Sequence, residues 1–254
     1  MYPRHFVAAL VVVVVLETCW ANDVLWRKVQ IDLERDHGVN LSEAAKEVVT
    51  YCSQDSNICC AMACTKQDWC ELWYRDAIGD CVLTNIIVSP SYQGISPTPL
   101  ICYTKRKKDL IMQHARKIYG TETAPTHPLR LVTNLINGFY RRHIANDCYT
   151  STGSEKPWVL IDLGKEMAVR EVHFIAPPNS YMAENYFRDI RIKMGTTRII
   201  NGDLRSYKLL ANFTGPVKPK EIVIIKRDKP IVGRYISFQK KSEKALAICY
   251  VELF

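Results

Sequence analysis

The cysteines are the residues of this chain whose chemistry follows most directly from their number and spacing. Ten occur in 254 residues, and Cys148 and Cys249 bracket a long segment without any other. Seven lie close together: Cys52, Cys59, Cys60, Cys64, Cys70, Cys81 and Cys102. In an oxidising compartment such residues form disulfides, whereas in the cytosol the same density favours metal or redox chemistry.

The N-terminus indicates the oxidising compartment. An apolar run from Phe6 to Leu16, followed by the small residue Ala21, is typical of a secretory signal peptide over residues 1–21. The run is shorter than the roughly 20 residues of a membrane-spanning helix, so no membrane span is expected. Sequons at Asn40 and Asn212 predict glycosylated surface positions. We therefore expect a secreted, extracellular glycoprotein.

The histidines do not form a catalytic pattern. None lies in a His-Glu-x-x-His motif or beside a Gly-x-Ser-x-Gly turn. A nucleophile, base and stabiliser that could converge are not indicated, so we expect no enzyme.

The net charge of +8 gathers in three basic runs. They are Lys105-Arg-Lys-Lys, Lys226-Arg-Asp-Lys and Lys240-Lys-Ser-Glu-Lys. Together they could bind sulfated glycans, or each could be a solvated linker or turn. No nucleic-acid recognition motif accompanies them, so a nucleic-acid partner is not expected.

The first half predicts a small module of helices and short strands. Apolar spacing predicts one helix up to Val49, starting at Asn40 or Ser42. A second helix, Ile58 to Lys66, puts Cys60 and Cys64 on one face, where they could staple it to a sheet. Short strands are predicted at 69–75 and 81–88.

The second half has the pattern of an all-β sandwich or barrel. Residues 104–128 read as a basic linker between a module at 22–103 and one at 129–254. Seven short strands separated by turn residues are predicted: 158–163, 169–176, 187–194, 206–211, 221–226, 232–239 and 246–254.

Several motifs follow one another in the second half. They are Leu135-Ile-Asn-Gly, Cys148, Pro157-Trp-Val-Leu-Ile-Asp-Leu-Gly, Phe187-Arg-Asp-Ile-Arg-Ile-Lys-Met-Gly, Gly233-Arg-Tyr-Ile and Leu246-Ala-Ile-Cys-Tyr-Val-Glu-Leu. In order and spacing they resemble the F-type lectin (fucolectin) domain of the discoidin superfamily. The resemblance implies a mainly β fold, a jelly-roll β-sandwich of the galactose-binding-like type, and a Cys148–Cys249 disulfide.

The resemblance also implies a glycan site whose usual residues are replaced. The family holds a terminal fucose with a His and two Arg; here Thr150 stands at the His, and the Arg positions fall on Pro177 or Asn179 and on Glu184 or Tyr186. Losing three charge-assisted donors, each worth roughly 1.5 to 3 kcal/mol, predicts loss of fucose specificity. The candidate ligand-binding residues are Thr150, Asn179, Tyr181, Glu184 and Tyr186.

Calcium is the one cofactor that the resemblance implies. Asn137 stands where the family has an Asp and Tyr250 where it has a Glu, while Asp147 adds a carboxylate before Cys148. The candidate metal residues are Asn137, Asp147 and Cys249. Calcium requires several hard oxygen ligands, so a retained site and a lost one remain alternatives.

The cysteine pattern of the first half is Cys60-Ala-Met-Ala-Cys64, Cys70, Trp73-Tyr74 and Cys81-Val-Leu, enclosed by Cys52 and Cys102. It resembles a PAN/apple module, a small disulfide-rich α+β unit; an unrelated disulfide scaffold is the alternative. The resemblance implies three bridges: Cys52–Cys102, Cys60–Cys81 and Cys64–Cys70. Cys59 is then unpaired, which predicts a disulfide-linked homodimer or, as the alternative, a free buried thiol.

The sequence is compatible with two functions. The first is a secreted, non-catalytic protein that recognises an extracellular glycan or glycoprotein through the loops around Thr150 and 177–186. The second is a structural or adhesive protein that binds sulfated glycans or protein partners through its basic runs.

Overall fold

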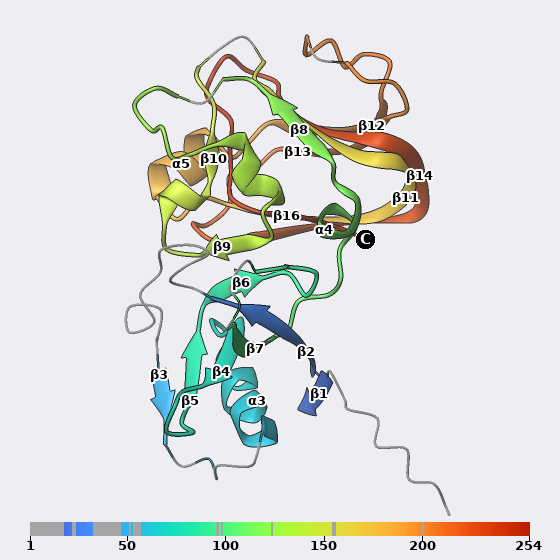
Figure 1. Cartoon of the computed structure of the whole chain (residues 1–254). Helices are drawn as coiled ribbons and strands as arrows, with labels where there is room; N and C mark the ends of the chain where they lie inside the picture. The colour runs from blue at the N-terminus through green and yellow to red at the C-terminus, as the bar shows by residue number, and fades with distance from the viewer. Residues whose placement is uncertain are drawn as a thin grey trace, which may run out of the picture.

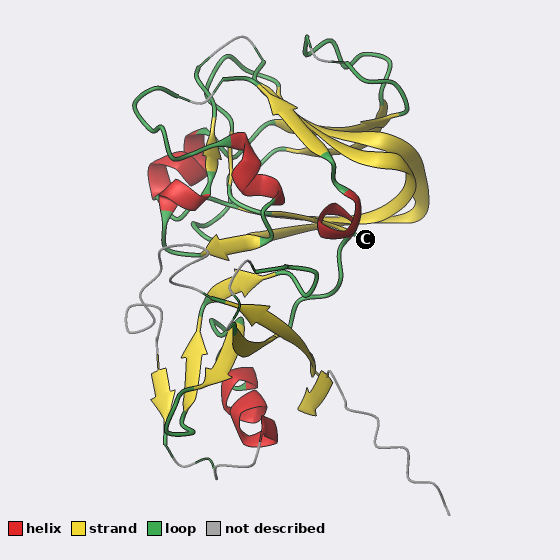
Figure 2. Ribbon diagram, in the orientation of Figure 1, coloured by secondary structure: helices red, strands yellow, loops and turns green. Residues whose placement is uncertain are grey.

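The computed structural model describes residues 18–21, 24–32, 47–50, 52, 57–94, 97, 99–122, 124–153, 156–199 and 201–254. Most of the predicted signal peptide and the sequon at Asn40 lie outside these residues. The described part confirms a mainly β protein, in which a smaller and a larger half pack end to end (Figures 1 and 2).

The first half is an antiparallel sheet with one helix on its face, strand order β1-β2-β7-β4-β5-β3. Its elements are β1 (Thr18–Ala21), β2 (Val24–Ile31), β3 (Glu47–Val49), α3 (Asn57–Thr65), β4 (Leu72–Arg75), β5 (Cys81–Thr84) and β7 (Leu100–Thr104). The second predicted helix is confirmed as α3. The first is not: its last three residues form β3 instead, because they pair with β5, and its other residues lie outside the described part.

Three of the four predicted disulfides are present: Cys60–Cys81, Cys64–Cys70 and Cys148–Cys249. The Cys52–Cys102 prediction is wrong, because Cys52 joins Cys59 and Cys102 is a buried free thiol. Cys59 is therefore not unpaired, and it is not available for the predicted intermolecular bridge.

Strand alternation explains the different pairing. Successive side chains of a strand point to opposite faces of the sheet. In β7, Tyr103 packs on the face that α3 and Cys52 cover, while Cys102 packs on the other face with Leu72. Cys102 thus cannot reach Cys52, whose sulfur lies within 4.8 Å of the Cys60 and Cys81 sulfurs.

We expect disulfide mapping to find a Cys52–Cys59 peptide. Cys102 should resist alkylation in the native protein, because burial shields its thiol and raises its pKa, and should react after unfolding. Mass spectrometry of the unreduced digest checks the linkage, and Cys102→Ala should remove the newly labelled site. A Cys52–Cys102 peptide would contradict this arrangement.

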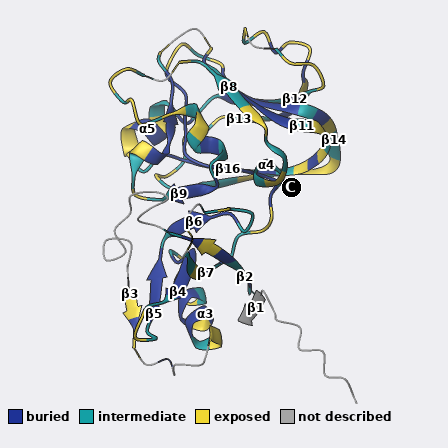
Figure 3. Cartoon of the chain, viewed as in Figure 1, coloured by how far each residue is buried: buried dark blue, intermediate teal, exposed yellow. Residues whose placement is uncertain are grey.

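The second half is the β-sandwich, whose main sheet has the strand order β13-β12-β14-β11-β16, with β8 also paired to β11. Its strands are β8 (Lys117–Gly120), β10 (Tyr149–Thr150), β11 (Trp158–Ile175), β12 (Ile190–Gly195), β13 (Lys208–Phe213), β14 (Ile222–Lys240), β15 (Ala247–Ile248) and β16 (Val251–Leu253). Its helical elements are α4 (Leu110–His114), η1 (Val132–Ile136), η2 (Ala145–Asp147) and α5 (Ser180–Asn185). In Figure 3 the buried residues are dark blue, and many of them lie along strands of this half, such as β11 and β16.

Two long strands replace four of the predicted short ones. β11 joins the predicted strands 158–163 and 169–176, and β14 joins 221–226 and 232–239. Irregularities after Asp162 and Val169 absorb the turn-like residues without ending the pairing. The turn-like residues therefore form bulges within the two strands and do not end them.

Residues 104–128 are not a linker. This segment contains α4 and β8, and β8 pairs with β11. Ile111 is buried in the sandwich core and Ile118 packs against it. These apolar residues were not recognised in the sequence because most of the segment is polar. The sandwich therefore begins within residues 104–128.

A two-stranded ribbon joins the halves. β6 (Ile86–Val88) pairs antiparallel with β9 (Phe139–Arg141), one strand from each half (Figure 1). Val88 and Phe139 pack into the core of the first half, while Ile87 and Tyr140 pack around the Cys148–Cys249 bridge. Alternate residues of the ribbon thus belong to opposite cores, as the period of two in a strand allows.

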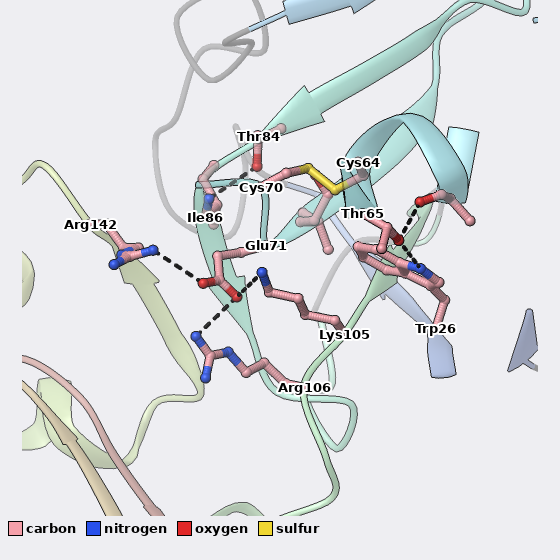
Figure 4. Close-up of a disulfide and its surroundings, with 12 residues drawn as sticks. Trp26, Cys64, Thr65, Cys70, Glu71, Thr84, Ile86, Lys105, Arg106 and Arg142 are labelled. Atoms are coloured by element: carbon pink, nitrogen blue, oxygen red, sulfur yellow. Dashed lines mark hydrogen bonds and ion pairs between the residues drawn. A yellow bond between two sulfur atoms is a disulfide. The ribbon is translucent and has the colours of Figure 1, made fainter. Parts of the chain in front are cut away.

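A buried ion-pair network lies beside this ribbon (Figure 4). The Glu71 carboxylate, 2% exposed, lies 3.2 Å from Arg142 Nη1 and 2.9 Å from Arg106 Nη2. Lys105 Nζ is 3.6 Å from the same carboxylate, and Arg106 also faces Glu252 at 3.6 Å. Burial alone would lower the pKa of Arg106, but Glu71 and Glu252 raise it above its usual value. Two residues predicted as linker are therefore central to the interface.

Asp109 forms a second polar link. It caps α4 by accepting from Met112 N at 3.0 Å, and it accepts a hydrogen bond from Ser89 Oγ, at the end of β6, at 2.9 Å. Burial raises the pKa of Asp109 from 3.8 to about 6, and the nearby Glu252 carboxylate adds to the effect. Ionised Asp109 is thus disfavoured in the folded state.

Asp109→Asn should change how stability depends on pH. Because the folded pKa exceeds the unfolded one, the contribution of Asp109 is full below about pH 4 and is lost as the pH rises through about 6. Relative to wild type, the variant should gain on the order of 2 to 3 kcal/mol between pH 4 and 7.5. Urea unfolding across that range checks it, with the exposed Asp68→Asn as control. A pH-independent difference would refute the assignment.

Candidate functional site

The helix α5 presents polar and aromatic side chains on the surface of the sandwich. Asn179 Oδ1 accepts from Met182 N at 3.2 Å and so caps its start. Met182 is buried beneath the helix, whereas Tyr181 is 61% exposed and Glu184 is exposed. Tyr186 lies edge-on to Tyr181, with ring centroids 5.4 Å apart. We name Tyr181, Glu184 and Tyr186 the α5 surface.

A depression of about 620 Å³ adjoins this surface. It is lined by Glu184, Asn185, Arg188, Pro216, Val217, Lys218, Pro219 and Glu221. Glu184 belongs to both features, and Tyr181 is its neighbour one helical turn earlier. Carboxylate, amide, ammonium and guanidinium groups thus line the depression, and the exposed ring of Tyr181 lies on the same helix, one turn from Glu184.

Lys240 holds the end of α5 from the interior of the sandwich. Its side chain is 1% exposed, and Nζ donates to the carbonyls of Asn185, Tyr186 and Arg188 at 2.9, 3.2 and 3.1 Å. Burial lowers its pKa to about 8. Sequence reasoning missed this role, because Lys240 was read as part of an exposed basic run. Its position as the last residue of a half-buried strand was the available signal.

The five predicted ligand residues divide into two groups. Asn179, Tyr181, Glu184 and Tyr186 come together on α5 and its ends. Thr150 does not join them: it is 2% exposed in β10, which pairs with β15. The side chain of Asn179 is itself engaged as the helix cap.

Arg130 is the cation that connects these two regions. Its carbonyl accepts from Thr150 N, and its Nη1 lies 3.5 Å from the sulfur of Met182 in α5. The sequence analysis did not single out Arg130, because it belongs to no recognised motif and comes just after the predicted linker at 104–128.

The residues predicted to hold calcium are engaged elsewhere. Asp147 accepts from Arg141 N, Nε and Nη2 at 2.8, 2.9 and 2.6 Å, so a guanidinium neutralises this carboxylate. Asn137 Oδ1 accepts from Phe139 N, and the sulfur of Cys249 is in a disulfide. Calcium binds hard oxygens, and the side-chain oxygens of this set are committed, so the set as arranged does not fit the ion.

Two other clusters have structural explanations. The three neighbouring sulfurs of Cys52, Cys60 and Cys81 all belong to disulfides and are not thiolate ligands. His173 lies between the carboxylates of Glu171 and Glu252, its Nδ1 3.2 Å from Glu252. It thereby extends the interface network.

The predicted basic runs do not form one open surface. Lys105 and Arg106 contact the buried Glu71, and Lys240 is buried under α5. Lys226 lies 3.6 Å from Glu171 on an exposed part of β14. Among the described helices, none has the length and apolar composition needed to cross a membrane.

No protein-family model and no curated protein matches this sequence. Among solved structures, the chain is similar to a fucolectin from the serum of the striped bass, Morone saxatilis, at 17% identity and a TM-score of 0.49. That match covers 58% of this chain and 49% of the other, so it spans about half of the bass protein's length.

Two further structures are similar over most of their own length. The lectin domain of lectinolysin in complex with Lewis B antigen has 15% identity, a TM-score of 0.46, and coverage of 59% of this chain and 97% of its own. A fucose-binding module of Streptococcus pneumoniae, SpX-3, has 8% identity, a TM-score of 0.44, and coverage of 58% and 98%.

Lys240→Met should destabilise the protein by about 2 to 4 kcal/mol, because buried carbonyls at the end of α5 lose their donor. Its exposed neighbour provides the control: Lys241→Met should change the free energy of unfolding by less than about 0.5 kcal/mol. Urea denaturation measures both. Equal stability of the two variants would mean that Lys240 does not anchor α5.

Proposed function

We propose that the sandwich is a non-catalytic glycan-binding module whose ligand lies on the α5 surface and in the adjoining depression. One observation carries the proposal: the exposed Tyr181, packed edge-on with Tyr186, lies one helical turn from Glu184, which lines a hollow together with polar side chains of both charges. A sugar ring has an apolar face, which packs on an aromatic ring, and hydroxyl groups that pair with polar side chains.

The preferred ligand is a neutral glycan without a requirement for terminal fucose. Glu184 and Glu221 offer acceptors and Arg188 and Lys218 offer donors, so hydroxyls of either hydrogen-bonding role find partners. The resemblance to F-type lectins, which puts Thr150 and residues of 177–186 at the positions of their fucose-binding His and two Arg, supports this choice. In this proposal, hydrogen bonds to the sugar hydroxyls and stacking on an aromatic ring take the place of that triad.

Binding is proposed to be independent of calcium. Arg141 supplies the positive charge beside Asp147, so the loop does not need an ion for its stability. The protein is proposed to act outside the cell, since four disulfides are compatible with an oxidising compartment.

The adhesive alternative, binding through the basic runs, has less support. Lys105, Arg106 and Lys240 are committed to contacts inside the protein, which removes them from an exposed cationic surface.

We expect wild type to bind neutral glycans without terminal fucose on a glycan array, equally with calcium and with chelator. Tyr181→Ala should weaken binding about tenfold or more, because an aromatic contact is lost. Tyr181→Phe, which keeps the ring, is the matched control and should retain most of the affinity.

Three results would contradict the proposal. They are absence of binding to every glycan, binding limited to fucosylated glycans in the presence of calcium, or full binding by Tyr181→Ala.

A further inference from the structure

The outer face of the main sheet carries a second concave surface. Direct strand pairing aligns Asn212 of β13, Arg191 of β12, Gln239 of β14 and Trp158 of β11 in one row. Residues paired in this way point to the same face of a sheet. The row thus places a cation, two amides and an indole side by side.

The chain after β12 folds over this face and forms a wall. Leu204 and Tyr207 are buried in a cluster with Leu160 on the outer side of the sheet. Gly202, at φ +76°, closes against Trp158: a Cβ there would lie 2.7 Å from the indole ring, so only glycine fits without movement. The wall is therefore a built feature of the fold.

The resulting groove has a volume of about 540 Å³ and an excess of positive charge. Lys156, Arg191, Lys193 and Arg205 line it, against one carboxylate, Asp203. Arg205 pairs with that carboxylate at 2.7 and 2.6 Å, so the excess of positive charge is that of Lys156, Arg191 and Lys193.

Lys193 shows how closely these cations are placed. Its Nζ donates to Leu204 O at 2.8 Å, which fixes the ammonium at the base of the wall. Burial lowers the pKa of Lys193, and the nearby Arg191 guanidinium lowers it further. An anion in the groove would relieve this repulsion.

We propose that this basic groove binds an acidic saccharide, a chain of sugar rings that bear carboxylate or sulfate groups. The cations match the anionic groups, while Asn201, Gln239 and the partly exposed Trp158 suit hydroxyls and a ring face. A bare anion would need only the cations. The groove shares no lining residue with the depression beside α5, so it is a separate site from the one proposed above.

The test is calorimetric titration of the full chain, after enzymatic removal of N-linked glycans because Asn212 borders the groove. A heparin-derived tetrasaccharide supplies sulfate and carboxylate, and a hyaluronan tetrasaccharide supplies carboxylate alone. A tetranucleotide tests for binding by charge only. Arg191→Gln combined with Arg205→Gln removes two groove cations, and Lys165→Gln combined with Lys229→Gln removes two exposed cations elsewhere.

We expect wild type to bind the heparin tetrasaccharide, with affinity falling as salt rises from 0.05 to 0.3 M because exposed charges are screened. The groove variant should bind about tenfold more weakly or worse, and the control variant within about twofold of wild type. Binding of the hyaluronan tetrasaccharide as well would assign the site to carboxylates, and its failure to bind would assign it to sulfates.

Four results would overturn the proposal. They are no binding of either tetrasaccharide, equal binding by wild type and groove variant, equal losses in groove and control variants, or equal affinity for the tetranucleotide. Circular dichroism and thermal unfolding establish that both variants fold. Tyr181→Ala should bind the heparin tetrasaccharide normally, which separates this proposal from the one for the α5 surface.

Discussion

The buried carboxylate of Glu71 is the interaction on which the arrangement of the two halves depends. It contacts three cations from two segments of the chain: Lys105 and Arg106 after β7, and Arg142 after β9. Removing one partner of such a network typically costs about 3 to 5 kcal/mol, because the other charge is left buried and unpaired. The network fixes how the halves lie against each other, because the contacts of Glu71 with Arg142 and of Arg106 with Glu252 join groups of the two halves.

The same network determines where the sandwich begins. Arg106 faces both Glu71 and Glu252, and three residues later Asp109 caps α4 and accepts from Ser89. The chain thus passes from the first half into α4 and β8 with no free segment between them. The ribbon of β6 and β9 adds an apolar contact on each side, so the smaller half supports the face of the sandwich on which it lies.

The two surfaces proposed to bind glycans lie on the same sandwich. The α5 surface is held from within by Lys240 and offers one exposed aromatic ring with groups of both charges. The basic groove is held by Leu204 and Tyr207, and offers cations around Trp158. A neutral ligand and an acidic one would therefore not compete, because the surfaces share no lining residue.

Sequence patterns predicted the features that depend on residues close together along the chain. The helix α3, the β character of the second half and three bridges followed from spacing and resemblance, whereas the helix α5 was expected to be a loop. The predictions failed where the position of a residue depends on a partner far away in the sequence. Cys102 was paired with Cys52 because spacing does not show the face of a sheet, and Thr150 was expected at a ligand site although it is buried in β10.

The charged residues show the same limit. Lys105, Arg106 and Lys240 read as solvated because their partners, Glu71 and the carbonyls after α5, are far away in sequence. The basic groove was not found either, since its cations come from separate strands and a loop. Strand register, which alternation alone does not supply, brings them together.

Differential scanning calorimetry of the full chain, with and without the heparin tetrasaccharide, tests the central claim that the halves form one folded unit bearing these surfaces. The account predicts a single transition that shifts upward as a whole with ligand, because binding to the sandwich then also stabilises the smaller half. Two separate transitions, of which only one responds to the ligand, would contradict it.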